Sequence, residues 1–231
     1  MKKLIALAFV AGVLALAPAQ TAQAVTLHPS LTPGDTFHLV FITADRRDAL
    51  SPNIADYNTF VQNQAASAGL DTLFGQSLNW RVIGSTDSVH ARDNIGDPTS
   101  PIYNTMGQTV AANETDLWDA ALENPIEYDQ HANLLQVFVG TGTTSTGEAA
   151  FPIGSPIFFT VGFSGNSEQR WINTSEDRTQ APYSFYAISS EITYVPEPTT
   201  LALMGLAGLM LTRRAAPPLT LPRSCLARRM Q

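Results

Sequence analysis

The chain has 231 residues, 44% of them hydrophobic and 14% charged, with a formal net charge of −7. Residues 25–195 are far more acidic, because they hold six Arg, no Lys and nineteen Asp or Glu, a net charge of −13. That charge repels phosphate backbones and excludes nucleic acid as the expected partner, and the lack of cysteine in the same residues excludes disulfides and thiol chemistry there.

Residues 1–24 are expected to be a signal peptide. Lys2 and Lys3 supply a positive start, residues 4–16 form an apolar segment, and Ala22 and Ala24 complete an A-x-A cleavage sequence. A permanent N-terminal anchor is the alternative, but the apolar segment is shorter than a membrane-spanning helix requires. We therefore expect export, with signal peptidase as the first partner and cleavage after Ala24.

Residues 25–195 are long enough for one domain with its own core. The β-rich run at 36–43 predicts a buried strand. Ser51 is expected to cap a helix that has Pro52 at its first position and that stops at Gly69. Apolar residues at spacings of three and four mark the buried face of this helix: Ile54, Tyr57, Val61, Ala65 and Ala68.

The later part of the body is expected to be mostly β. A second helix is predicted at 114–122, capped by Asn113. Strand-like runs lie at 79–85, 134–140, 156–163, 169–172 and 183–193. Because strands and helices do not alternate regularly, the pattern predicts an α+β domain with two helices and small, mostly antiparallel sheets.

Candidate metal ligands in the body are few. Asp93, Asn94 and Asp97 place three oxygen side chains around Gly96, whereas a calcium cage needs six to eight oxygens. A capped turn is the favoured interpretation of this segment, with Asp93 and Asp97 as weak metal candidates. We therefore expect no cofactor.

Other candidate groups also have simpler structural interpretations. Asp116 and Asp119 are placed to share a helix face, but acidic residues there complement the helix dipole. Ser164 lies in a Gly-Phe-Ser-Gly sequence that only half fits a nucleophile elbow. The histidines lack metal-ligand spacing, and the tryptophans are expected in the core rather than on a sugar-stacking surface: His28, His38, His90, His131, Trp80, Trp118 and Trp171.

Short sequence motifs occur in a fixed order through the body, at 41–43, 53–56, 91–93, 101–103, 115–118, 125–126, 139–143 and 186–187. Their order resembles the C-type-lectin-like and endostatin-like secreted domains. This resemblance implies a compact α+β fold whose long loops bind sugars, proteins or surfaces. The body lacks that family's disulfides and its Glu-Pro-Asn, Gln-Pro-Asp and Trp-Asn-Asp motifs, so calcium-dependent sugar binding is not implied.

Residues 196–214 have three parts. They are Pro196, Glu197 and Pro198, an apolar run at 199–212, and Arg213 with Arg214. The prolines favour an extended spacer. As a helix, the 14 apolar residues would rise about 21 Å, short of a hydrocarbon core of about 30 Å. The arginines can snorkel and the bilayer can thin, so a weak transmembrane anchor is expected.

This tripartite order resembles the PEP-CTERM sorting signal of Gram-negative bacteria that make exopolysaccharide. The resemblance implies recognition by exosortase, a membrane-embedded protease-transpeptidase, after transient anchoring in the inner membrane, followed by release or transfer to the cell surface. The alternative is an unprocessed amphiphilic tail. Residues 215–231 extend beyond the usual end of that pattern and are expected to be a basic, disordered tail.

Three functional classes stay open for the exported body. A non-catalytic binding or adhesion module is favoured, with extracellular polysaccharide or a surface protein as its partner. A secreted hydrolase would need two carboxylates facing each other across a cleft. A structural protein of the biofilm matrix would need an exposed sheet edge.

Overall fold

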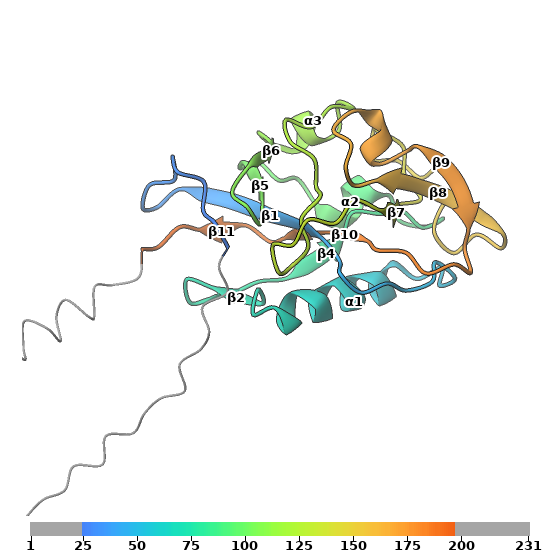
Figure 1. The fold of residues 1–231 in the computed structure, drawn as a ribbon, viewed down its shortest axis with the longest axis horizontal. Coiled ribbons are helices and arrows are strands. Elements are labelled where there is room, and N and C mark those ends of the chain that lie inside the picture. Colours follow the sequence, from blue (N-terminus) through green and yellow to red (C-terminus); the bar gives the residue numbers. More distant parts are fainter. Residues whose placement is uncertain (1–24, 197–231) are drawn as a thin grey trace, which may run out of the picture. The chain divides into compact units, whose positions relative to one another are not determined.

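The central strand of the protein, β1 (Thr36–Ile42), forms where its β-branched and aromatic residues predict it. The structure is a computed structural model that describes residues 25–196 (Figure 1). β1 lies within a six-stranded sheet of order β4-β10-β1-β5-β6, and β11 pairs with the start of β1. The partner strands are β4 (Trp80–Val82), β5 (Ile102–Asn104), β6 (Thr109–Ala111), β10 (Tyr186–Ser189) and β11 (Ile192–Thr193).

Most strand pairs in the protein are antiparallel. Within the central sheet only β1 and β5 run parallel. A second sheet consists of β7 (Phe138–Gly140), β8 (Phe158–Phe163) and β9 (Ser175–Arg178), all antiparallel, and β2 (Thr72–Leu73) pairs with β3 (Gln76–Ser77). These short elements confirm the α+β class.

Helix α1 (Ile54–Ser67) is present, but its predicted cap is wrong. Asn53, not Ser51, is the N-cap, and its side chain accepts a hydrogen bond from the Ala55 amide. Ser51 instead lies before the helix and donates its hydroxyl to the Asp56 carboxylate in the first turn of α1. Gly69 follows the helix at φ 71°, a conformation that favours glycine, so the predicted stop is confirmed.

Of the other helical elements, one is shorter than the sequence predicts and two were not predicted as helical. They are α2 (Ala91–Ile95), α3 (Glu114–Leu117) and the 3₁₀ turn η1 (Gln169–Trp171). The side chain of Asn113 caps α3 as expected, although the helix ends at Leu117 instead of 122. The predicted strand at 169–172 is wrong, because the 3₁₀ turn buries Trp171 and Ile172, which are neighbours in sequence, in the same core. A strand would send these two side chains to opposite faces.

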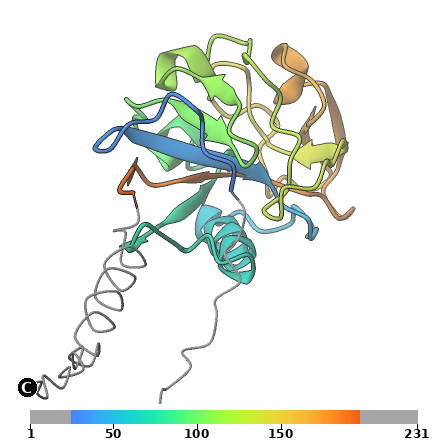
Figure 2. The same cartoon turned by 60° about the vertical axis from the view of Figure 1, so that its left-hand side comes forward.

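Two hydrophobic cores lie on opposite sides of β1. Phe37, Leu39 and Phe41 contribute to the core under α1, and Val40 and Ile42 contribute to the other core. Figure 2 shows α1 on one side of the central sheet and α3 on the other. This alternation explains why β1 is apolar at nearly every position, since both of its faces are covered.

The three tryptophans are core residues. Trp80 belongs to the core under α1, and Trp118 stacks on Trp171 in the second core with their ring centroids 6.2 Å apart. All three are at most 6% exposed. The core interpretation of these residues is confirmed, and a sugar-stacking surface has to be sought elsewhere.

Candidate functional site

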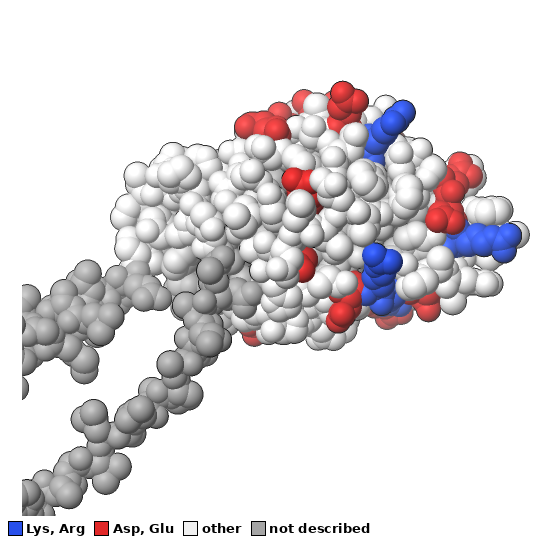
Figure 3. Space-filling model, in the orientation of Figure 1, with Lys and Arg blue, Asp and Glu red and all other residues white. Residues whose placement is uncertain are grey.

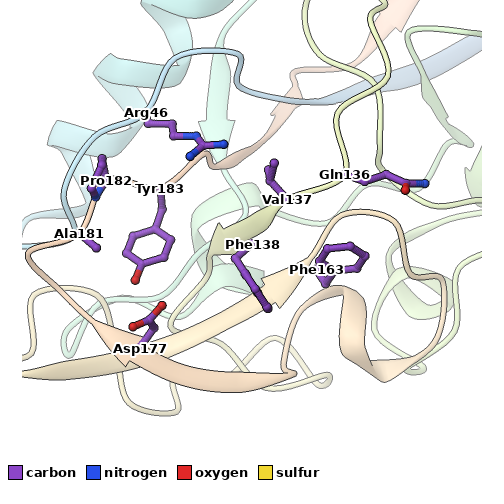
Figure 4. Close-up of a pocket in the computed structure, with 9 residues that line it drawn as sticks. All are labelled: Arg46, Gln136, Val137, Phe138, Phe163, Asp177, Ala181, Pro182 and Tyr183. Carbon is purple, nitrogen blue, oxygen red and sulfur yellow. The ribbon is translucent and has the colours of Figure 1, made fainter.

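A cleft of about 400 Å³ opens beside the sheet formed by β7, β8 and β9 (Figure 4). Phe138 of β7 and Phe163 of β8 form its apolar wall, and strand register pairs these two residues directly. Their ring centroids lie 5.7 Å apart in an edge-to-face arrangement. Phe138 is 53% exposed, so a large aromatic surface faces solvent at this wall.

Ser164 fixes the segment that carries Phe138. Its hydroxyl donates to the Leu135 carbonyl at 2.7 Å and accepts from the Val137 amide at 2.9 Å. Ser164 is fully buried. The half-fitting nucleophile elbow is therefore a structural turn whose serine holds the wall of the cleft.

The opposite wall comes from two segments that are distant in sequence. Arg47 and Tyr183 exchange backbone hydrogen bonds of 3.0 and 2.7 Å, which holds the loop that carries Arg46 beside residues 181–183. The Tyr183 hydroxyl donates to the Arg178 carbonyl at 3.2 Å. Burial and the neighbouring Asp177 carboxylate raise the pKa of Tyr183 well above its ordinary value, so its hydroxyl stays protonated at physiological pH.

The rim of the cleft offers both donors and acceptors. Arg46 is exposed and belongs to neither of the two ion pairs found in residues 25–196. Figure 4 shows its guanidinium pointing from the loop toward Val137, and Asp177 lying near the Tyr183 hydroxyl. The Gln136 amide nitrogen donates to Glu127 at 2.7 Å, which leaves its oxygen as an acceptor. Aromatic surface and polar groups therefore meet in one cleft.

A second hollow, of about 280 Å³, is lined by more titratable groups. The Nδ1 of His38 lies 3.0 Å from the Ser189 carbonyl, which can only accept, so Nδ1 carries the proton. Burial lowers the pKa of His38 and keeps the ring neutral at pH 7. Asp97 and Glu191 also line this hollow.

Glu191 does not match the general acid of a glycosidase. A hydrogen bond from Ser100, 2.5 Å long, lowers the pKa of Glu191. A glycosidase's general acid has a raised pKa, so Glu191 is suited only to the part of base or nucleophile.

The weak metal candidates are not assembled into a cage. Asp93 lies exposed in α2 and Asp97 follows the helix. The side chain of Asn94 between them donates to the Val82 carbonyl at 2.8 Å and shares hydrogen bonds with Asn58, which lie at 2.9 and 3.0 Å. Within residues 25–196, no group of three or more His, Asp or Glu side chains is placed to hold a metal ion.

Replacing Asp93 or Asp97 by Asn is expected to leave the melting temperature within about 2 °C, with and without calcium, because surface substitutions usually change stability by less than about 0.5 kcal/mol. Thermal melts of the two variants beside the parent, each in calcium and in chelator, check this result. Calcium stabilisation of the parent that either variant loses would instead assign a calcium site to this segment.

The remaining predicted groups serve local structure. The carboxylates of Asp116 and Asp119 accept from the Ala112 and Ala121 amides at 2.6 and 2.9 Å, and Asp119 lies beyond the end of α3. His90 accepts from the Ala149 amide at 2.8 Å, and His28 stacks on Tyr103.

The sorting residues fall largely outside the described chain. Pro196 is exposed, whereas Ala22, Ala24, Glu197, Pro198, Arg213 and Arg214 lie outside the described residues, as does the predicted transmembrane run. None of the helices in the described part is long and apolar enough to cross a membrane.

Sequence reasoning did not find Phe138, Phe163, Arg46 or Tyr183 as members of one site. The available signal was the pair of strands predicted at 134–140 and 156–163, which contain Phe138 and Phe163. Only the register between these strands places the two residues side by side. Comparison with models of known protein families gives no match for this chain, and comparison with curated proteins gives none either.

Proposed function

We propose that this chain is exported, held briefly in the inner membrane by its C-terminal helix, and processed by an exosortase-type protease to reach the cell surface or the extracellular matrix. The observation that carries the proposal is the order of signals along the chain. An A-x-A cleavage sequence comes before the body, and the Pro-Glu-Pro sequence, the apolar run and the Arg-Arg pair follow it. The folded body supports it. Thr26 takes part in the fold through its backbone hydrogen bond to the Thr105 carbonyl, and strand β11 ends at Thr193, just before the Pro-Glu-Pro part.

The body is proposed to be a non-catalytic binding or adhesion module of the C-type-lectin-like kind. Its short sheets and its long connections after α3 and after β7 support this assignment. The cleft beside Phe138 supports binding, because it offers exposed aromatic surface and polar groups in one place.

A secreted hydrolase is the second candidate, because Asp97 and Glu191 line the same hollow. A self-assembling matrix protein is less well supported. The edge strand β9 presents Glu176, Asp177 and Arg178, all exposed, and charged edge strands resist edge-to-edge pairing.

Replacing Pro196, Glu197 and Pro198 together by Ala is expected to make precursor accumulate in the membrane fraction of a host that carries an exosortase, because the sorting protease would no longer recognise its signal. Parent protein should be released with a mass that lacks residues 1–24 and the C-terminal apolar run. Fractionation and intact-mass analysis measure both results.

The matched control replaces Pro217 and Pro218, which lie after the arginines, and should be released like the parent. The sorting variant should keep the melting temperature of the body within about 2 °C, because the residues lie after the last strand. Normal release of the sorting variant, or mature protein that retains either end, would refute the proposal.

A further inference from the structure

We propose that the cleft beside Phe138 binds one sugar ring of a neutral polysaccharide, with the ring stacked on the exposed aromatic surface. This inference rests on the proposed binding function and names its site and ligand class. None of the three tryptophans takes part, since all are buried.

The apolar wall favours a ligand with a flat face. Phe138 keeps 53% of its surface exposed although it lies directly across from Phe163. The segment around it is held by the two hydrogen bonds of Ser164, so the ring is presented from a fixed backbone. A rigid exposed aromatic ring suits the C–H face of a pyranose, which is apolar while its edge carries hydroxyls.

The rim favours a ligand whose edge both donates and accepts. Arg46 supplies only donors, and the carboxylate of Asp177 supplies only acceptors. The amide oxygen of Gln136, whose nitrogen donates to Glu127, adds a further acceptor. Sugar hydroxyls are donors and acceptors at once, so they match all three groups.

The charge of the body favours a neutral polymer. Residues 25–195 carry a net charge of −13, and Figure 3 shows acidic side chains spread over the face drawn, with few basic ones among them. A long anionic polymer would be repelled by that field, which Arg46 alone does not reverse. A cationic polymer would be held all over the acidic surface rather than at the cleft. The cleft, at about 400 Å³, is large enough for a small-molecule ligand such as one sugar ring.

The test is affinity electrophoresis of the full chain in detergent, through gels that contain dextran, laminarin or mannan as neutral polymers, alginate as the anionic one, or chitosan as the cationic one. At least one neutral polymer should retard the protein. Phe138→Ala should weaken that binding about tenfold, which corresponds to about 1.4 kcal/mol, because the sugar ring would lose its aromatic contact. Arg46→Gln and Asp177→Asn should each weaken it as well.

Phe158→Ala is the matched control. Phe158 is 46% exposed on the same sheet, but it points to the face opposite Phe159 and Phe163, away from the cleft. This variant should bind within about twofold of the parent, and binding of the parent should be insensitive to salt because a neutral ligand is not screened.

Retardation by none of the neutral polymers, equal loss in Phe138→Ala and Phe158→Ala, or binding that falls steeply with salt would each overturn the inference. The proposed function fails separately, by normal release of the Pro196, Glu197 and Pro198 variant. A correctly sorted protein that binds none of the neutral polymers would therefore refute sugar binding at the cleft and leave the proposed sorting intact.

Discussion

Replacing Val61 by Asp is expected to leave the protein largely unfolded or insoluble. Val61 is completely buried on α1, in the same core as Leu39 and Phe41. An unpaired carboxylate there costs several kcal/mol, against a total stability of about 5–15 kcal/mol for a typical domain. The body contains no disulfide to offset the loss, since residues 25–195 lack cysteine. Soluble yield and a circular-dichroism melt measure the effect.

Asn63→Asp is the control for this substitution. Asn63 lies exposed on the same helix, so the change adds the same charge without burying it. The control should melt within about 2 °C of the parent. A Val61→Asp protein that melts like the control would contradict the packing of α1 on the central sheet.

Replacing Gly162 by Ala is expected to destabilise the protein by about 3 kcal/mol. An added Cβ would overlap the backbone carbonyl of Trp171, and neither backbone can move without disturbing β8 or η1. The same carbonyl accepts the buried hydroxyl of Tyr186 at 2.9 Å, and the Trp171 ring packs on Trp118. A shift of η1 would therefore open the second core.

The expected change in melting temperature for Gly162→Ala is a decrease of about 6–12 °C, since about 1 kcal/mol corresponds to about 2–4 °C for a domain of this size. Gly165→Ala is the control, because its Cβ would meet only the side chains of Gln136 and Phe163, which can move. Equal melting temperatures for the two variants would contradict the close packing of the η1 backbone against Gly162 of β8.

Local signals in the sequence were sufficient for α1 and β1. The apolar spacing from Ile54 to Ala65 predicts the buried face of α1, and the β-branched run predicts β1. The helix cap was misplaced, because Ser51 and Asn53 are both good capping residues and only the path of the chain decides between them. The strands β5 and β6 were missed, since each has three residues and no periodic pattern can be read over so short a segment.

The sequence by itself determined the charge of the body, the absence of cysteine from it, the predicted signals at both ends and the α+β class, because each depends on composition or on contiguous residues. Tertiary structure alone decided that 169–172 forms a 3₁₀ turn instead of a strand, because Trp171 and Ile172 both pack in the second core. It also decided where the candidate site lies. Phe138, Phe163, Arg46 and Tyr183 come from four separate segments, and only strand register and chain crossing bring them to one cleft.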